Sequence, residues 1–157
     1  MSNVPRFIAD VMLGKLARWL RLLGFDTTYF RVIDDNTLVK TALQEERILL
    51  TRDTGIARRK KIQRLILIHS NNTTEQLKEV FSAFNINETE FPASRCSLCN
   101  GELASACPSS VADRIPEYVF LNAASFFTCR ECGKVYWHGS HKKSIDNILK
   151  KILRNGQ

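Results

Sequence analysis

The sequence predicts an α/β fold, in which helices cover both faces of a parallel sheet and a small metal-binding module and a terminal helix follow. Through about the first 84 residues, short apolar stretches alternate with amphipathic stretches of helical period. Strands that are apolar throughout and separated by helices are typical of a buried parallel sheet. Farther on, two Cys-x-x-Cys pairs indicate a second unit held by a metal ion. We therefore expect two domains, residues 1–90 and residues 91–157.

Four short strands are expected in the first domain, and a helix follows each of them. The strands are Phe7–Ala9, residues 27–31, Ile48–Thr51 and residues 65–68. The helices cover residues 13–23, 35–43, 56–61 and 74–84. No glycine-rich phosphate-binding motif follows any of these strands, which argues against dinucleotide and P-loop nucleotide sites.

The first of these helices is apolar on one side and basic on the other. Its leucines recur at helical spacing, and Gly24 supplies a stop signal. The basic stripe consists of Lys15, Arg18 and Arg21. Such a stripe is often the solvated face of an amphipathic helix, and we expect Arg21 in particular to face solvent.

The second domain follows a linker, residues 85–94, which contains Pro92. Its metal-binding module covers residues 95–137 and contains stretches rich in strand-forming side chains. The strands expected there are residues 118–121, residues 126–128 and Val135–Trp137. A terminal helix is expected over approximately residues 142–154.

Four cysteines, Cys96 with Cys99 and Cys129 with Cys132, have the spacing of a zinc site. Each pair places two thiolates on one tight turn, and two facing turns form the tetrahedral sulfur cage that Zn²⁺ prefers. Four thiolates leave no open position for water, so this zinc is expected to be structural. Disulfide bonding is the alternative, but the odd total of five cysteines and the lack of a secretory signal count against it. The fifth, Cys107, is expected to be an ordinary small residue.

The composition is that of a basic globular protein. A chain of 157 residues with 44% hydrophobic content can bury one full core and a small second unit. The formal net charge of +7 suits a polyanionic partner, although many other proteins are this basic. No run of about 18 apolar residues is present, so we expect no membrane span. The amino terminus lacks a signal-peptide core, so the cytoplasm is the expected compartment.

Three aspartates are expected at one edge of the parallel sheet. Asp10 and Asp53 end the first and third strands, and Asp35 begins the helix after the second. The carboxyl ends of parallel strands meet at one edge, where open α/β sheets form their sites. Three carboxylates repel one another unless a cation neutralises them, and such oxygen ligands suit Mg²⁺ or Mn²⁺. A metal held there can orient a water molecule and stabilise charge on a phosphodiester.

The same aspartates also stand where helices begin, and aspartate is a favoured N-cap. Capping is the commoner role for any one of them alone, while three at one edge favour a shared site. Asp34 lies beside Asp35 and competes with it for the third place. The basic run over residues 58–61 is a candidate for holding a nucleic-acid backbone at this edge, although such a run is more often solvent-exposed charge than a binding patch. The side chains expected to hold a nucleic-acid backbone near this edge are Lys15, Arg18 and Arg52.

Three blocks of the sequence are more specific than these patterns. They are residues 10–26 (DVMLGKLARWLRLLGFD), residues 47–53 (RILLTRD) and, beyond the cysteine pairs, residues 135–141 (VYWHGSH). Together they resemble the Mut-seven C-terminal RNase domain family over almost the whole chain. The resemblance implies a PIN-type nuclease fold joined to a zinc ribbon. It also implies a metal-dependent ribonuclease, with a cation bound by Asp10, Asp35 and Asp53 and with His141 contacting phosphate or packing against the nuclease domain.

The first functional hypothesis is therefore a ribonuclease that acts on single-stranded or structured RNA, with the zinc ribbon assisting recognition. The second is a non-catalytic RNA- or protein-binding adaptor whose aspartates serve as helix caps. An adaptor would bind RNA without divalent metal and would never cleave it. A phospho-receiver ranks far behind, because that class needs an adjacent acidic pair after the first strand, and here Val11 follows Asp10.

Overall fold

The larger unit of the protein is built on a four-stranded parallel sheet. The computed structural model describes residues 4–87, 91–138 and 140–154. The strands are β1 (Phe7–Ala9), β2 (Thr27–Tyr29), β3 (Ile48–Thr51) and β4 (Leu65–Leu67), in the spatial order β2-β1-β3-β4. Every neighbouring pair runs parallel, as the apolar stretches of the sequence predict.

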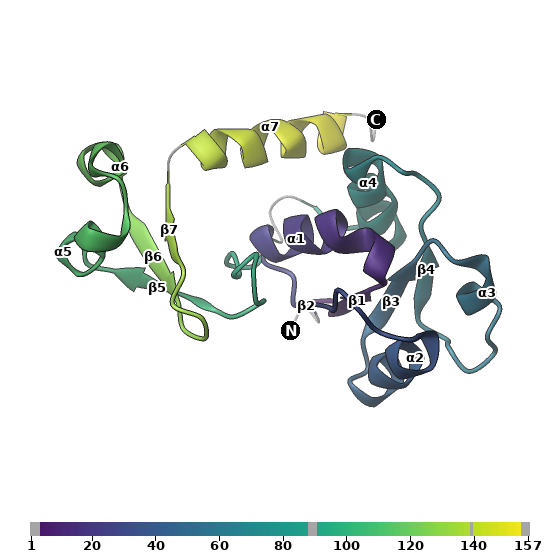
Figure 1. Ribbon diagram of the computed structural model, residues 1–157. Coiled ribbons are helices and arrows are strands. Elements are labelled where there is room, and N and C mark those ends of the chain that lie inside the picture. The colour runs from purple at the N-terminus through teal and green to yellow at the C-terminus, as the bar shows by residue number, and fades with distance from the viewer. Residues whose placement is uncertain (1–3, 88–90, 139, 155–157) are drawn as a thin grey trace.

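Helices cover both faces of this sheet, because alternate side chains of each strand point to opposite sides (Figure 1). Phe7 and Ala9 belong to one core, beneath α1 (Gly14–Leu22) and α4 (Thr73–Phe84). Ile8 belongs to the other core, beneath α2 (Asp35–Gln44) and α3 (Thr54–Ala57). A 3-10 turn, η1 (Val11–Leu13), leads from β1 into α1. The predicted α/β arrangement is confirmed, but the helix expected over residues 56–61 is wrong in its bounds, because α3 begins at Thr54 and ends at Ala57.

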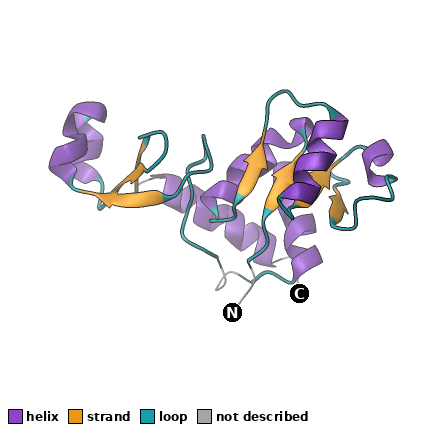
Figure 2. Cartoon of the chain, turned by 90° about the horizontal axis from the view of Figure 1, so that it is seen from below, coloured by secondary structure: helices purple, strands orange, loops and turns teal. Residues whose placement is uncertain are grey.

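The second unit contains a three-stranded antiparallel sheet, which lies at the opposite end of the molecule from the parallel sheet (Figure 2). Its strands are β5 (Leu103–Ala106), β6 (Phe126–Cys129) and β7 (Val135–Trp137), in that spatial order. Between β5 and β6 lie two short helices and a 3-10 turn. These are α5 (Pro108–Val111), η3 (Ala112–Arg114) and α6 (Glu117–Asn122).

The expected strand at residues 118–121 is wrong, because this segment belongs to helix α6. Pro116 precedes the helix, and the negative charge of Glu117 in the first turn stabilises the helix by interacting with the positive end of its dipole. Of the apolar side chains, Tyr118 and Leu121 are exposed, while Val119 packs in a small core with Phe126. The third strand of this sheet is β5, a Leu-Ala-Ser-Ala segment of low strand propensity that the sequence does not mark as a strand.

The terminal helix returns to the larger unit. α7 (Ser140–Arg154) runs from β7 back across α1 to α4 (Figure 1). Ile152 is buried in the same core as Phe7, and Ile145, Ile148 and Leu149 pack against that core. α7 therefore adds a layer to the parallel-sheet unit, and the domain boundary near residue 90 stays a prediction. None of the helices in the described ranges, α7 included, is long and apolar enough to cross a membrane.

The chain between the two units passes close to the end of α1. Gly24 has a φ of +94°, and a Cβ at this position would lie 2.3 Å from the carbonyl oxygen of Pro92. Phe91 packs its ring against Phe25 and Phe81 in the larger core. The connection is therefore held against the parallel-sheet unit from Phe91 onward.

Candidate functional site

The four paired cysteines converge in the second unit. The Sγ atoms of Cys96, Cys99, Cys129 and Cys132 all lie within 4.8 Å of one another. The Sγ–Sγ distance is 3.7 Å between Cys96 and Cys132 and 3.4 Å between Cys99 and Cys129. A tetrahedron with Zn–S bonds of about 2.3 Å has edges of about 3.8 Å, so the cluster has the size of a metal cage. All five cysteines are free thiols, and the cluster can hold a metal ion.

Both cysteine turns end in a residue with a positive φ, as a tight reversal requires. Asn100 follows the first pair with a φ of 70°, and Gly133 follows the second with a φ of 77°. Next to Asn100, a Cβ on Gly101 would lie 2.7 Å from the Sγ atom of Cys129. A side chain at position 101 would therefore intrude on the cluster.

Tyr136, on β7, braces the first cysteine turn. Its hydroxyl oxygen lies 3.0 Å from Cys96 Sγ and accepts a 3.0 Å hydrogen bond from the backbone N–H of Ser97. Burial opposes ionisation of Cys96, but hydrogen bonds from Tyr136 and from backbone groups of the turn lower the pKa of its thiol to about 6. Cys96 is therefore a thiol that ionises readily, whereas burial and the neighbouring thiols raise the pKa of Cys99 to about 12. A bound metal requires the thiolate form of both.

Arg21, on α1, holds the first cysteine turn against the parallel-sheet unit. Its guanidinium donates hydrogen bonds to the carbonyl oxygens of Ser97 at 3.0 Å and Leu98 at 3.3 Å. Its Nε donates to the carbonyl oxygen of Thr27 at 2.8 Å. Arg21 is only 6% exposed, so the expectation that it faces solvent is wrong. The physical reason is that a segment more than 70 residues away supplies two of its three carbonyl acceptors.

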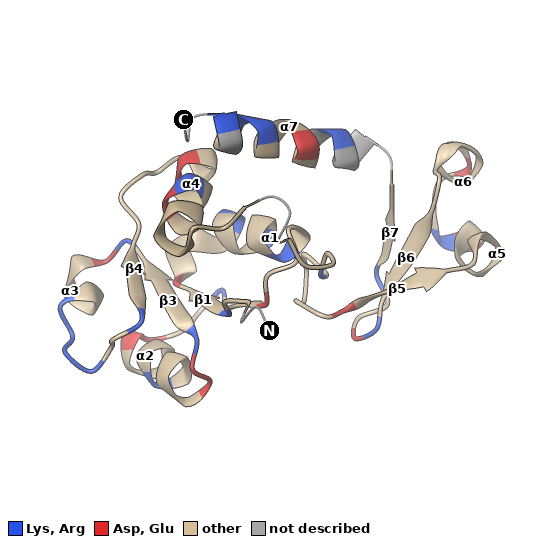
Figure 3. Ribbon diagram, turned by 180° about the vertical axis from the view of Figure 1, so that it is seen from behind, with Lys and Arg blue, Asp and Glu red and all other residues tan. Residues whose placement is uncertain are grey.

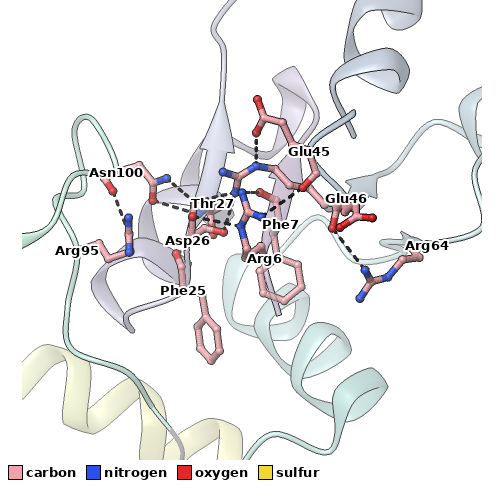
Figure 4. A network of polar contacts seen from close by, with 11 residues as sticks. Arg6, Phe7, Phe25, Asp26, Thr27, Glu45, Glu46, Arg64, Arg95 and Asn100 are labelled. Carbon is pink, nitrogen blue, oxygen red and sulfur yellow. Dashed lines mark hydrogen bonds and ion pairs between the residues drawn. The ribbon is translucent and has the colours of Figure 1, made fainter. Parts of the chain in front are cut away.

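A second polar network joins the cysteine turn to the amino ends of the strands (Figure 4). The side chain of Asn100 donates to Asp26 Oδ1 at 2.7 Å and accepts from the backbone N–H of Thr27 at 3.0 Å. Arg47 donates to the same Asp26 oxygen, also at 2.7 Å. β2 begins at Thr27 and β3 begins just after Arg47, so this network lies at the amino-terminal edge of the sheet. The cysteine cluster therefore docks at the edge opposite the carboxyl ends of the strands.

At the carboxyl ends of β1 and β3, one threonine links two aspartates. Thr51 is fully buried; its hydroxyl donates to Asp10 Oδ2 at 2.8 Å and accepts from the backbone N–H of Asp53 at 3.0 Å. The other Asp10 oxygen accepts from the N–H of Val11 at 2.7 Å. Asp53 Oδ1 accepts from two N–H groups at the start of α3, at 2.7 and 3.3 Å. Both aspartates thus act as caps and stand at the carboxyl-terminal edge of the sheet, which we call the acidic edge.

Asp34, and not Asp35, caps helix α2. Asp34 accepts hydrogen bonds from the hydroxyl and the N–H of Thr37, at 2.6 and 2.9 Å, and these bonds lower the pKa of its carboxyl group. Asp35 is exposed, and its carboxylate lies 3.9 Å from the guanidinium of Arg59. Among the described residues, the ligand atoms of the four cysteines lie within 4.8 Å of one another. The carboxylates in the same part of the chain form no group of three or more that is equally close.

The predicted substrate-binding residues occupy different environments. Lys15, in the first turn of α1, and Arg18 are both exposed. Arg52 lies between Thr51 and Asp53, and its buried Nε has no hydrogen-bond partner among the described residues. His141 lies in the first turn of α7, and its side chain falls outside what the structure describes. This Nε is enclosed by the protein, so a substrate can reach only the other parts of the half-buried Arg52 side chain.

A comparison with protein families bears on both the acidic edge and the cysteine cluster. The family model described as the Mut7-C RNAse domain matches residues 5–149, which is nearly the whole chain. The chain belongs to this family. The match to the Mut7-C domain extends over the acidic edge and the cysteine cluster alike, as the sequence resemblance predicts. No curated protein and no solved structure matches the chain significantly.

Two residues that organise these regions of the Mut7-C domain are absent from the predicted set. Thr51 ends an apolar strand, where a threonine is ordinary, and its hydroxyl role depends on the neighbouring strand β1. Tyr136 follows the second cysteine pair, and its contact with Cys96 joins segments 40 residues apart. Thr51 and Tyr136 lie inside the blocks 47–53 and 135–141, which carry the family resemblance, and this is the sequence feature that could have pointed to them.

Proposed function

We propose that this Mut7-C domain is a ribonuclease that hydrolyses RNA phosphodiester bonds with Mg²⁺ or Mn²⁺ bound at the acidic edge. The observation that carries the proposal is the hydrogen-bonded link from Asp10 through Thr51 to Asp53. This link joins the Asp10 carboxylate to the backbone that bears Asp53, at the ends of two neighbouring strands. Membership of an RNase family supports RNA as the substrate.

The donor groups at this edge suit a hard cation. Carboxylate oxygens are the ligands that Mg²⁺ and Mn²⁺ prefer. Asp10 and Asp53 are oriented by backbone N–H groups, and each carboxylate keeps lone pairs for a further ligand. Asp35 adds an exposed carboxylate. Its 3.9 Å ion pair with Arg59 is also exposed, and such a pair is weak enough for a cation to replace it. When bound, the cation supplies an oriented water and stabilises charge on the phosphodiester.

The residues of the chain take separate roles in this proposal. Thr51 positions the Asp10 carboxylate through its 2.8 Å hydrogen bond. His141 stays a predicted phosphate contact. The cation is held by Asp10, Asp35 and Asp53. The phosphates of the backbone are neutralised by Lys15, Arg18 and Arg52.

We infer that the metal of the cysteine cluster is a structural Zn²⁺. Four thiolates fill a tetrahedral shell and leave no position for water. The cluster also docks at the amino-terminal edge of the sheet, opposite the edge that carries Asp10 and Asp53. Thiols that must stay reduced to bind zinc support a reducing compartment such as the cytoplasm. The assistance of this zinc ribbon in RNA recognition stays a prediction.

The test is cleavage of a labelled RNA by the zinc-loaded protein, with and without added Mg²⁺ or Mn²⁺. We expect cleavage that requires the divalent cation and that disappears in Asp10→Asn. Asp113→Asn removes an exposed carboxylate in the second unit and should leave cleavage unchanged. RNA binding that needs no divalent cation, together with no cleavage, would instead favour the adaptor function.

A further inference from the structure

A basic hollow lies between α2 and the segment that follows α3. Its volume is about 760 Å³. Four cations line it: Lys40 from α2, and Arg59, Lys60 and Lys61 from the segment after α3. In the part of the chain that the structure describes, no carboxylate belongs to its lining. Figure 3 shows the same concentration of lysine and arginine on the segment after α3, facing α2.

One end of this hollow meets the acidic edge. The Arg59 guanidinium donates a 2.8 Å hydrogen bond to Asn36 Oδ1 and lies 3.9 Å from the carboxylate of Asp35. Asn36 belongs to the lining, and Asp35 is one of the proposed cation ligands. A strand of nucleic acid lying in the hollow would therefore enter the acidic edge beside Asp35.

The α2 side of the hollow combines polar and apolar groups along one face of the helix. Asn36, Val39, Lys40 and Leu43 follow the i, i+3, i+4, i+7 spacing of a single face. With a rise of 1.5 Å per residue, Asn36 and Leu43 are about 10 Å apart along the helix. Leu43 is 46% exposed, so an apolar surface is open to a ligand beside the cations. Such a lining suits the flat faces of unpaired bases together with backbone phosphates.

We propose that this hollow binds single-stranded RNA on one side of the bond that is cleaved. The inference rests on the proposed function and deepens it, because it names unpaired RNA as the ligand and gives its path past Asp35. Charge complementarity favours a polyanion, and membership of an RNase family favours RNA over an acidic protein segment. The concave shape and the exposed Leu43 favour a single strand over a duplex, whose bases are stacked inside.

α7 carries a second group of cations and provides the matched control. Lys150 and Lys151 are adjacent and exposed, as are Lys60 and Lys61. α7 packs on the core beneath α1 and α4, while the hollow adjoins the core beneath α2 and α3, on the other face of the sheet. The double variants K60Q/K61Q and K150Q/K151Q therefore remove the same charge from opposite faces of the molecule.

The experiment measures binding of a labelled 12-nucleotide single-stranded RNA to the zinc-loaded protein without added Mg²⁺ or Mn²⁺, over a range of salt concentrations. We expect K60Q/K61Q to weaken binding. The plot of log binding constant against log salt concentration should become less steep by about 1.4, which is about 0.7 for each lost phosphate contact. K150Q/K151Q should leave both quantities close to those of the unchanged protein. Equal melting temperatures of the two variants would show that both are folded.

Three outcomes would overturn this inference. Equal losses in the two double variants would mean that only diffuse net charge matters. A blunt RNA duplex that loses as much affinity in K60Q/K61Q as the single strand would refute the preference for unpaired RNA. An oligoglutamate that binds and responds like the RNA would make an acidic protein the better ligand. Cleavage is assayed separately. Cleavage that persists unchanged in K60Q/K61Q would refute only the proposal that the hollow binds the RNA. Loss of binding in K60Q/K61Q alone, with no cleavage by the unchanged protein, would refute only the proposed ribonuclease activity.

Discussion

The guanidinium of Arg21 donates a 3.0 Å hydrogen bond to the carbonyl oxygen of Ser97, inside the first Cys-x-x-Cys turn. This contact fastens the metal-binding turn to helix α1 of the parallel-sheet unit. Burial lowers the pKa of Arg21, and the nearby charges of Cys99 and Cys96 oppose that shift. A zinc ion with four thiolates carries a net negative charge, so the same charge interaction stabilises a metal-loaded cluster beside Arg21.

Replacing Arg21 should destabilise the protein and loosen its metal site. In Arg21→Met, three carbonyl oxygens lose their donor, and we expect the free energy of unfolding to fall by about 1–3 kcal/mol. Zinc should also pass faster to a chelator. Arg18→Met is the control, because Arg18 is exposed on the same helix and its loss should cost less than about 0.5 kcal/mol. Equal urea-unfolding midpoints for the two variants would contradict this assignment.

Asp26 should make the free energy of unfolding depend on pH in the acid range, near and below pH 4. Burial raises its pKa, but hydrogen bonds from Arg47 and Asn100 outweigh this and hold it below the ordinary value of 3.8. The unfolded chain then binds the proton more tightly, so the stabilisation by Asp26 is complete above about pH 4 and is lost as the pH falls through the folded pKa. We expect Asp26→Asn to cost about 1–3 kcal/mol at pH 7.

The check is urea unfolding of both proteins at several pH values. The difference between the unchanged protein and Asp26→Asn should shrink steadily as the pH falls below 4, because Asp26 loses its charge on protonation and then resembles the uncharged asparagine. A difference that stays constant down to the acid-unfolding range would show that the charge of Asp26 contributes nothing.

The cysteine cluster should bind about one equivalent of zinc with tetrahedral Zn–S distances near 2.3 Å. Cys99→Ser removes one ligand and should abolish stoichiometric zinc while the parallel sheet, which has its own cores, remains folded. Cys107→Ser is the control, because Cys107 is exposed and lies outside the cluster. Metal analysis that finds no zinc in the unchanged protein, or equal zinc in both variants, would refute the site.

Two adjacent aspartates separate the capping role from the catalytic role. Asn is as good an N-cap as Asp, so Asp34→Asn should leave both folding and RNA cleavage unchanged. Asp35→Asn removes a proposed cation ligand and should reduce cation-dependent cleavage by at least the roughly 10- to 100-fold that loss of a supporting group costs a metal site. The reverse result would place Asp34, and not Asp35, at the cation.

The parts of the fold that could be predicted from sequence are those set by local pattern. Phe7–Ala9 and Ile48–Thr51 are short apolar strands because both of their faces are buried, and burial on both faces leaves a continuous apolar stretch. The cysteine cluster was predictable for a similar reason, since ligand spacing within each turn is local. The contacts of Arg21 and Thr51 were not predictable, because their partners come from distant segments.

The error at residues 118–121 has a different origin. Tyr118 and Leu121 suggest a strand by their type, yet both are exposed in the helix, so their apolar character does not report burial. For the aspartates, the sequence predicted both a shared edge and helix capping. The structure shows Asp10 and Asp53 as caps, whereas α2 is capped by Asp34 and not by Asp35. Capping and cation binding are compatible, because a carboxylate has more acceptor positions than a cap uses.

The most direct test of the proposed cation site is a crystal soaked in Mn²⁺ and measured for anomalous scattering. We expect an anomalous peak between the carboxylates of Asp10, Asp35 and Asp53, with Arg59 displaced from Asp35. A soaked crystal with no peak at this edge, in which Arg59 still pairs with Asp35, would contradict the proposal that these aspartates hold the catalytic cation.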